Sequence, residues 1–478
     1  MPLLIAAVAL LGVGYFALDK FVLSRHSGAS LPGASAQSAI PEQSIAVLPF
    51  VNMSSDKEQD YFSDGLTEEM IDLLGQVPDL RVPARTSSFY FKGKNEPISN
   101  IAQQLKVAHV LEGSVRKSGN TIRVTTQLIR ADSGYHLWSS TYDRDVKDIF
   151  KVQDEIAAAV VAALKMQLLP TQEVLNQHRT ANTQAYEQYL LGRQSLNRGT
   201  DEGLQRAVTA LQRAIALDPN YATAYAWLAV ALSFMNADAE AIVAASRAVA
   251  LAPGLAEAYA ARGYVRWRIQ WDWSGARADL EKALQLDPRD STSRRRYAGL
   301  LLALGELPEA TAAVQTAIKL DPLDGPNWIV LSRCLSATGD YVAAHRAVTR
   351  LLEISPEYSR WELAMIELLE GQTVEAQRIA KQQSYASLVA MAEHTLGHAK
   401  ESQQALDEWI TKYGKDSPTS VAEVYAWRAE ADKAFEWLER AYRQRDQDLS
   451  YLKVDPLLAH LRGDPRYKAL LRKMNLPE

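Results

Sequence analysis

The chain has 478 residues, of which 47% are hydrophobic and 23% charged, so it has enough apolar material for folded cores and is not disordered throughout. The formal net charge of −5 argues against a nucleic-acid-binding protein, which normally carries a basic domain. The single cysteine, Cys334, excludes an internal disulfide and a structural zinc site built from cysteines.

Residues 1–25 are predicted to form a transmembrane helix. The first 18 residues, MPLLIAAVALLGVGYFAL, carry no charge, and a run of about 18 apolar residues can cross a bilayer. A cleaved secretory signal is the alternative, because residues 34–36 resemble an A-x-A cleavage site. That site lies far beyond the apolar run, and no basic segment precedes the run, so the sequence favours an anchor.

Residues 26–43, HSGASLPGASAQSAIPEQ, contain small residues, proline and almost no charge, which is typical of a flexible linker. Residues 44–169 then alternate between strand-like and helix-like patterns and are predicted to form one small α/β domain. The expected elements, in chain order, are strand Ser44–Phe50, helix Tyr61–Leu74, strand Leu80–Val82, helix Ile98–Leu105, a hairpin of Ala108–Val115 and Thr121–Ile129, strand His136–Tyr142 and helix Ile149–Leu168.

Over residues 184–414 a purely helical repeat replaces the strand patterns. Prolines recur at intervals of 34, 35, 34 and 34 residues, and small residues recur where two helices must approach closely. A period of 34 is that of the tetratricopeptide repeat (TPR), so this region is predicted to form an α-α superhelical solenoid of helix pairs. Each proline ends a second helix because it cannot continue the hydrogen-bond ladder. The prolines are Pro219, Pro253, Pro288, Pro322 and Pro356.

The interval of 35 residues holds one extra residue, near Trp271-Asp272-Trp273 in the turn between two helices. Two interpretations stay open for these tryptophans, a contact site for a partner or packing over the neighbouring repeat. Beyond Pro356 the helix pairs shorten, and residues 415–478 are predicted to be a degenerate repeat with a helical cap, since the end of a solenoid must cover its core. The expected fold class is therefore mainly α, with a transmembrane helix, a small α/β domain and a TPR solenoid.

Three long segments resemble a known bacterial arrangement. SIAVLPFVNMSSDKEQDYFSDGLTEEMIDLL, from Ser44, and LEGSVRKSGNTIRVTTQLIRADSGYHLWSSTYDR, from Leu111, resemble the TolB-like amino-terminal domain. The C-terminal stretch AEVYAWRAEADKAFEWLERAYRQRDQDLSYLKVDPLLAHLRGDPRYKALLRKM, from Ala422, is similar to the end of the same proteins. In them the TolB-like domain commonly follows a single membrane span and precedes TPR repeats.

The resemblance implies a single-pass inner-membrane protein whose region after the span is periplasmic. Lys20 and Arg25 follow the span, and the positive-inside rule taken alone implies the opposite orientation; we follow the resemblance. In related proteins a cytoplasmic output domain often precedes the span, either the winged-helix module of CadC-like regulators or a nucleotide cyclase. Because this chain begins at the span, a function that requires such a domain is not expected of this chain alone.

No catalytic motif is found: the sequence contains no phosphate loop, no G-x-S-x-G elbow and no H-E-x-x-H helix. His394 and His398 could face one metal ion from a helix, but no third ligand lies near in sequence, so a solvated surface is favoured. The acidic run from Asp56 to Asp72 lacks the ligand spacing of a calcium site and is interpreted as a solvated helix face. We therefore expect no enzyme activity, no cofactor and no metal.

The candidate binding site is the concave face of the solenoid, which the first helix of each repeat lines. Alignment on the prolines places arginines from three successive repeats there, with two aromatic residues beside them. Guanidinium groups bind carboxylates in a bidentate manner, so an acidic or C-terminal peptide segment of a partner is expected. The alternative is that the arginines pair with acidic residues of neighbouring repeats. The site residues are Tyr264, Trp267, Arg268, Arg295 and Arg333.

The sequence thus predicts a membrane-anchored TPR scaffold or signal-sensing module that binds a protein or peptide and contacts no nucleic acid directly. The alternative function is the sensor portion of a one-component transmembrane transcriptional regulator, or of an adenylate cyclase, whose cytoplasmic output domain is absent from this chain.

Overall fold

The computed structural model of the protein describes residues 40–166, 179–197 and 199–477. The predicted transmembrane helix, residues 1–25, and most of the predicted linker lie outside the described residues. Within the part that is described, no helix is long and apolar enough to cross a bilayer. Glu42–Glu478 form one compact unit, which contains both the α/β region and the helical repeats.

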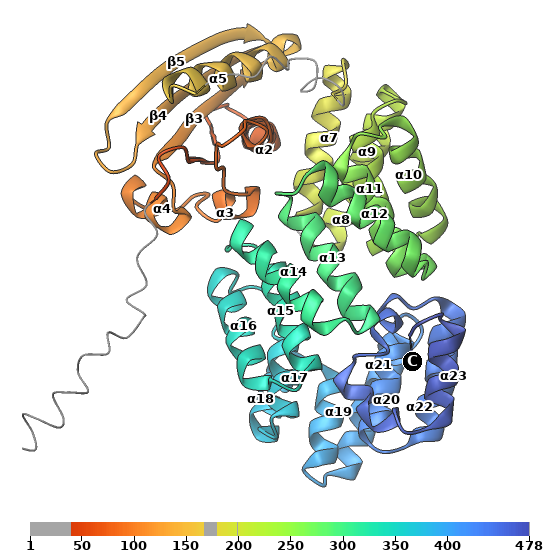
Figure 1. Ribbon diagram of the computed structural model, residues 1–478. Coiled ribbons are helices and arrows are strands. Elements are labelled where there is room, and N and C mark those ends of the chain that lie inside the picture. Colours follow the sequence, from red (N-terminus) through yellow and green to blue (C-terminus); the bar gives the residue numbers. More distant parts are fainter. Residues whose placement is uncertain (1–39, 167–178, 198, 478) are drawn as a thin grey trace, which may run out of the picture. The chain divides into compact units, whose positions relative to one another are not determined.

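The α/β region is built on a five-stranded mixed sheet (Figure 1). The strand order is β1-β3-β4-β5, and the short β2 also pairs with β3. β1 and β2 run parallel to β3, whereas β3, β4 and β5 are antiparallel neighbours. The strands are β1 (Ile45–Val47), β2 (Val51–Asn52), β3 (His109–Ser118), β4 (Thr121–Arg130) and β5 (His136–Asp145).

Helices α2 (Asp60–Gly75) and α5 (Ile149–Ala163) pack against the apolar side chains of this sheet. Alternation along β4 explains the packing, because Ile122, Val124 and Leu128 are buried whereas Arg123 is exposed. Helices α3 (Arg85–Phe89) and α4 (Ile98–Leu105) complete the region.

The predicted elements of this region are largely confirmed, and α4 has the predicted bounds. The prediction of a strand at Leu80–Val82 is wrong: only one isolated bridge forms there, between Ser44 and Arg81. The contact stays short because the chain turns into α3 a few residues later. Two short elements, β2 and α3, were not predicted.

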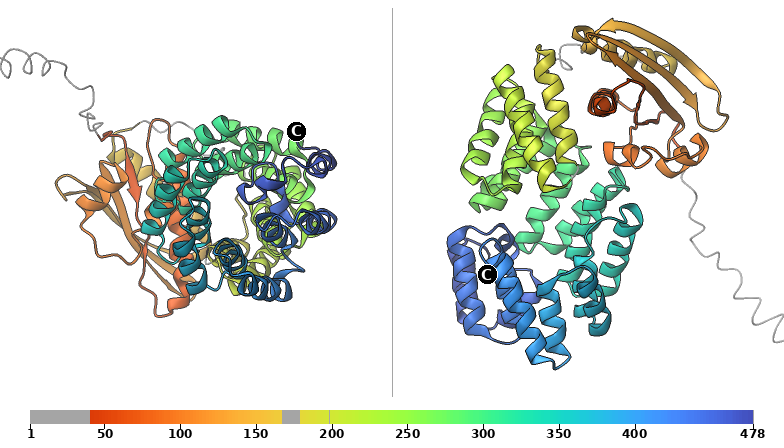
Figure 2. Two further views of the ribbon diagram at one scale, coloured as in Figure 1. Left: turned by 90° about the horizontal axis from the view of Figure 1, so that it is seen from below. Right: turned by 180° about the vertical axis from the view of Figure 1, so that it is seen from behind.

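The repeats consist of antiparallel helix pairs that follow one another along the chain (Figure 2). Small residues stand where the helices approach, as predicted: Ala229, Ala241 and Ala276 are fully buried. At Gly263 an added Cβ would lie 2.8 Å from the Cγ of Leu280. The helices are α7 (Thr183–Leu196), α8 (Asp201–Leu217), α9 (Ala222–Phe234), α10 (Asp238–Leu251), α11 (Ala256–Val265), α12 (Trp273–Leu286), α13 (Ser291–Leu304), α14 (Leu307–Leu320), α15 (Gly325–Ala337) and α16 (Tyr341–Ile354).

The extra residue of the 35-residue interval is absorbed as a π-helical turn, η5 (Arg266–Gln270), at the end of α11. The wider turn ends at Trp271, which adopts φ 55° and donates its backbone N–H to the carbonyl of Arg266. The insertion therefore sits before the turn at Trp271-Asp272-Trp273, one helical turn earlier than predicted. A π-turn accommodates one inserted residue without shifting the helices on either side.

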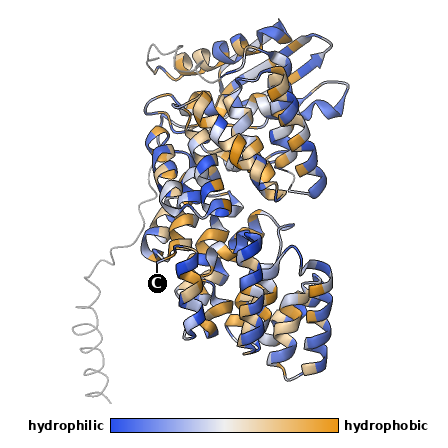
Figure 3. Cartoon of the chain, turned by 90° about the vertical axis from the view of Figure 1, so that its right-hand side faces the viewer, coloured by the Kyte–Doolittle hydropathy of each residue, from blue (hydrophilic) through white to orange (hydrophobic). Residues whose placement is uncertain are grey.

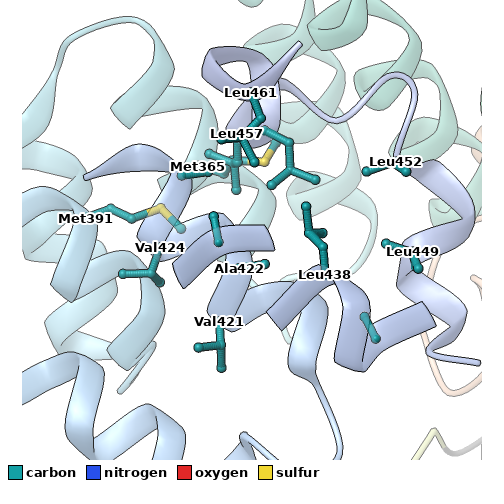
Figure 4. Close-up of a cluster of buried hydrophobic side chains, with 14 of the residues drawn as sticks. Met365, Met391, Val421, Ala422, Val424, Leu438, Leu449, Leu452, Leu457 and Leu461 are labelled. Atoms are coloured by element: carbon teal, nitrogen blue, oxygen red, sulfur yellow. The ribbon is translucent and has the colours of Figure 1, made fainter. Parts of the chain in front are cut away.

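The C-terminal region continues the helix pairs and then folds back as short helices. A large apolar cluster holds it together, in which Leu438, Leu449 and Leu457 are buried (Figure 4). Along the helices apolar residues alternate with polar ones, as expected of elements with one buried face (Figure 3). The elements are α17 (Trp361–Leu369), α18 (Thr373–Gln382), α19 (Ala386–Thr395), α20 (Ala399–Tyr413), α21 (Pro418–Trp427), α22 (Ala431–Gln444), η6 (Gln447–Tyr451), η7 (Pro456–Leu461) and α23 (Pro465–Lys473).

The two tryptophans of the inserted turn pack against this C-terminal region. Trp271 and Trp273 are 5% and 8% exposed, so they are not a free contact surface. The Trp273 indole donates to the backbone carbonyl of Met474 at 2.7 Å, and the Trp271 ring packs at a tilt against Tyr442 at a centroid distance of 5.6 Å. The interpretation that these tryptophans pack within the chain is confirmed. They cover the C-terminal helices as well as the adjacent repeat.

Two apolar contacts join the α/β region to the repeats, in addition to a hydrogen bond from Arg289 to the Leu80 carbonyl. At the first, α2 lies so close to α7 that a Cβ on Gly65 would come within 2.4 Å of the Leu190 side chain. At the second, Leu323 and Ile354 of the later repeats share an apolar cluster with Ala46 of β1. The sheet is thereby joined to both the first and the fifth helix pair.

Candidate functional site

All five predicted site residues lie on the first helices of their repeats, a surface called here the first-helix face. Tyr264 belongs to α11, Trp267 and Arg268 to the π-turn η5, Arg295 to α13 and Arg333 to α15. α11 contacts both α9 and α13, as the predicted inner face requires. The placement of the five residues on first helices agrees with the repeat alignment, and their role in binding stays a prediction.

Three of these residues contact Tyr451, which comes from the C-terminal region, and Tyr264 packs behind one of them. The Trp267 ring meets the Tyr451 ring edge to face at 5.7 Å, and Tyr264 contacts Trp267 at 5.9 Å. The guanidinium carbons of Arg268 and Arg333 lie 5.2 and 5.7 Å from the centre of the Tyr451 ring. Such cation–π contacts stabilise an aromatic side chain in a sheltered site. Burial raises the pKa of Tyr451, so the phenol is neutral at physiological pH.

Tyr451 is part of a short segment, Asp446–Tyr451, that we call the inner segment. Arg268 donates to Ser450 Oγ at 2.7 Å and to Asp448 Oδ1 at 3.1 Å. Gln447 donates to the backbone carbonyl of Ser233 at 2.8 Å. The inner segment therefore covers part of the first-helix face from within the same chain.

Arg333 and Arg295 pair with acidic residues of the next repeat. Arg333 forms an ion pair with Glu362, and Arg295 Nε lies 3.4 Å from Asp324 Oδ2. These ion pairs match the alternative stated from the sequence. Binding of a partner at the five residues remains a prediction.

Arg296 was missed by the sequence analysis, although it adjoins Arg295. Its guanidinium lies 5.2 Å from the centre of the Tyr264 ring. Among the described residues no carboxylate lies within 4.0 Å of it, whereas Arg268, Arg295 and Arg333 each have one. Enclosure by protein and the charge of Arg295 lower the pKa of Arg296, so an anion placed here would be stabilised. The run Arg294-Arg295-Arg296 is the sequence signal that could have identified it.

A buried pair of carboxyl groups lies where the repeats meet the α/β region. Asp321 and Asp324 are 2% and 6% exposed. Ser87 of α3 donates a hydrogen bond from its hydroxyl to Asp321. Burial and the neighbouring charge of Asp324 raise the pKa of Asp321 to about 7. This carboxyl group therefore titrates near neutral pH at a contact between the two regions.

The other candidate residues have structural partners. His394 lies in α19 whereas His398 precedes α20 and contacts Glu393 at 2.7 Å, so the two histidines do not share a helix. In the described part of the chain no group of three or more His, Cys, Asp or Glu side chains could hold a metal ion. Within the acidic run, Asp64 pairs with Lys92 at 2.6 Å and Glu68 pairs with Arg193 at 2.9 Å.

Two family profiles match the chain. Residues 41–159 match one described as "HilA/YgeH-like transcriptional regulator, second domain", and residues 270–334 match one described as "Tetratricopeptide repeat". The first match coincides with the α/β region, and the second runs from the end of η5 through α12, α13 and α14 into α15. The chain is also 43% identical over 188 residues to a protein named "Putative adenylate cyclase 3" from Rhizobium meliloti (strain 1021). That match covers 39% of this chain and 32% of the relative, so the chain spans about a third of the relative's length.

Solved TPR proteins overlap with part of the chain. A thermophilic TPR protein from Thermus thermophilus is 20% identical with a TM-score of 0.35, over 39% of this chain and 98% of its own. A TPR protein from Parabacteroides merdae ATCC 43184 is 14% identical with a TM-score of 0.35, over 62% of this chain and 100% of its own. Because both scores are low, the repeat assignment depends on the 34-residue period, the helix pairs and the family match.

The chain therefore carries tetratricopeptide repeats preceded by a HilA/YgeH-like regulator domain. Its class is that of a TPR protein-interaction scaffold. The likeness of residues 44–169 to a TolB-like domain stays an expectation.

Replacing Tyr451 by alanine should destabilise the protein. The change removes a ring that contacts Trp267 and two guanidinium groups, and truncation of such an aromatic side chain costs about 2–4 kcal/mol. Urea unfolding followed by circular dichroism measures the loss. Tyr135→Ala is the control, because Tyr135 is 75% exposed and its removal should change the free energy of unfolding by less than about 0.5 kcal/mol. Equal effects of the two changes would contradict the described contacts.

Replacing Asp321 by asparagine should stabilise the protein at pH 8 but not at pH 4.5. The folded-state pKa of about 7 lies above the ordinary value of 3.8, so the folded state binds more protons than the unfolded state between these values. The contribution of Asp321 to the free energy of unfolding is therefore fully present below pH 4 and is lost as the pH rises towards 7. An amide removes this loss and still accepts the hydrogen bond from Ser87. We expect a gain on the order of 2 kcal/mol at pH 8.

Thermal unfolding at both pH values checks this prediction. The exposed Asp416→Asn is the matched control and should show no pH-dependent gain. A gain of equal size at both pH values would mean that ionisation of Asp321 is not its cause.

Proposed function

We propose that the protein is a membrane-anchored TPR scaffold or signal-sensing module that binds an acidic segment of a partner protein through its first-helix face. The observation that carries the proposal is the inner segment. Its carboxylate at Asp448, hydroxyl at Ser450 and aromatic ring at Tyr451 are all held by residues of that face. A surface that holds an acidic and aromatic stretch of its own chain suits the same chemistry in a partner.

The part of the face beyond the inner segment supports this proposal. Phe234 is 54% exposed and its ring centre lies 6.2 Å from that of Tyr264, and the Arg296 guanidinium lies 5.2 Å from the centre of the same Tyr264 ring. An exposed ring beside an arginine without a carboxylate partner would gain both apolar contact and charge pairing from an acidic peptide. The proposal assigns the chain no catalysis of its own and no cofactor.

A second candidate function is the sensor portion of a one-component transmembrane regulator or of an adenylate cyclase. Two observations favour it: the HilA/YgeH-like match over residues 41–159 and the relative named as an adenylate cyclase. The expected likeness to TolB-like domains is consistent with the same arrangement. Mapping the translation start of the gene distinguishes the candidates, since a regulator or cyclase requires an output domain encoded in frame.

Arg296→Ala should reduce recovery of the partner. Immobilised full-length chain is incubated with membrane extract, and bound proteins are quantified by mass spectrometry. Loss of one sheltered charge-assisted hydrogen bond, worth about 1.5–3 kcal/mol, lowers recovery of a specific partner about tenfold or more. Arg346→Ala is the control, because Arg346 is exposed on the second helix of its repeat. Equal recovery by the wild type and Arg296→Ala, with unchanged circular dichroism, would exclude this part of the face.

We further propose that residues 1–25 anchor the chain in the inner membrane and that the C-terminal region is periplasmic. The support is the uncharged apolar run and, for the orientation, the resemblance to TolB-like proteins. The full chain should stay in the membrane fraction after an alkaline carbonate wash, whereas a chain beginning at Ser44 should be released. An alkaline phosphatase fused after Glu478 should be active. Release of the full chain would contradict the anchor, and an inactive fusion would contradict the orientation.

A further inference from the structure

The two edges of the sheet differ in how their backbone is covered. Beside β1, Ile45 donates to the carbonyl of Arg81 at 2.9 Å, and Arg81 donates to that of Gln43 at 3.0 Å. The adjacent Leu80 carbonyl accepts a hydrogen bond from Arg289 of the repeats at 3.0 Å. At the other edge β5 pairs with β4 only, among the strands that the structure describes. In Figure 1 β5 is the strand farthest from the helical repeats.

The backbone groups that face outward from β5 can be assigned from the hydrogen-bond pattern. Val146 donates to the carbonyl of Asn120 at 2.7 Å, so residues 120 and 146 form a hydrogen-bonded pair. Because such pairs alternate along an antiparallel ladder, Tyr142 and Ser140 also bond to β4. The intervening residues, Ser139, Thr141 and Asp143, direct their N–H and C=O groups to the free edge.

This edge lacks most of the features that keep sheet edges apart in monomeric proteins. β5 has 10 residues, no proline and no glycine, and its bulge lies at the opposite side, in the pairing with β4. Its charged residues, Asp143, Arg144 and Asp145, gather at one end. Near the other end Leu137 is 43% exposed. A long uncharged centre therefore offers unpaired backbone groups.

We propose that β5 pairs with β5 of a second copy of this chain, in an antiparallel ladder about a two-fold axis. Facing residues of an antiparallel ladder carry side chains on the same face of the sheet, and their outward N–H and C=O groups must point at each other. Odd-numbered residues of one copy therefore pair with odd-numbered residues of the other. The register that places Thr141 opposite Thr141 of the second copy brings Trp138 opposite Arg144 and Ser139 opposite Asp143. Thr–Thr, aromatic–cation and hydroxyl–carboxylate pairs are all favourable across strands.

A shift of one residue in each strand, towards the start of β5, gives a neighbouring allowed register, centred on Ser140. That register would place His136 opposite Arg144 and Leu137 opposite Asp143, so the favourable pairs are lost and a carboxylate lies beside an apolar side chain. The side chains therefore favour the register centred on Thr141. Pairing of one strand buries less than the area of a standard interface, so the dimer is expected to depend on concentration.

The first test uses Thr141→Pro in the full chain, purified in detergent. Proline removes the outward N–H, which bonds to the second copy, and leaves the ladder to β4 intact, as prolines do on edge strands. Thr141→Val is the matched control, since it removes the hydroxyl and keeps the N–H. Sedimentation equilibrium at several concentrations should show dimers for the wild type and for Thr141→Val. The dissociation constant of Thr141→Pro should rise at least tenfold, with an unchanged circular dichroism spectrum.

A wild-type chain that stays monomeric, or a Thr141→Pro variant that dimerises as tightly as the wild type, would overturn the proposal. A second variant tests the register even if the proline variant fails to fold. Thr141→Cys in a Cys334→Ser background should form a disulfide-linked dimer under mild oxidation, because hydrogen-bonded pairs have Cα atoms about 5.5 Å apart. Arg116→Cys, on β3 away from the edge, is the control and should not cross-link. Equal cross-linking at the two positions, or none at Thr141, would also overturn the proposal.

Discussion

A row of helix pairs buries apolar surface only between neighbouring pairs, so an uncovered apolar face remains at each end. The rest of this structure depends on how those two faces are covered. At the start of the row, α2 of the α/β region packs on α7, and the missing side chain of Gly65 allows Leu190 to approach. At the other end, η6, η7 and α23 fold back over the last pairs and bury Leu449, Leu457 and Leu470. The α/β region is therefore part of the solenoid's packing as well as a unit of its own fold.

The same covering determines what the first-helix face can bind. The inner segment is held by buried leucines, since Leu449 and Leu452 are 0% and 1% exposed, and a partner would have to release that packing to reach Trp267. Tyr264 and Arg296 lie beyond the segment and impose no such cost. Under the proposed function, a partner that first meets Arg296 would gain charge pairing before any internal contact is broken. The face thus combines a part that the chain fills itself with a part that the proposed function assigns to recognition.

The sequence was sufficient to predict those features that depend on residues close together in the chain. The 34-residue period, the alanines at helix contacts and the bounds of α4 all follow from residues close together in the chain. The assignment of Arg268, Arg295 and Arg333 to the first helices of their repeats is equally local. Their actual partners could not be predicted in the same way. Asp448 lies 180 residues beyond Arg268, and no periodic pattern relates the two. The π-turn escaped prediction for a different reason, because the count of residues shows that one is inserted but not which turn absorbs it.

The contact between Ser87 and Asp321 also has a consequence for synthesis, because the two residues are 234 positions apart. When the ribosome has completed the sheet, the apolar residues around Ala46 and Val110 still lack Leu323 and Ile354, which cover them in the finished protein. At about 5–20 residues per second the missing helices follow only after tens of seconds. During that time the nascent chain displays an incomplete core around β1 and β3. Holding factors that shield nascent chains would therefore act on this protein mainly between the emergence of β5 and that of α16.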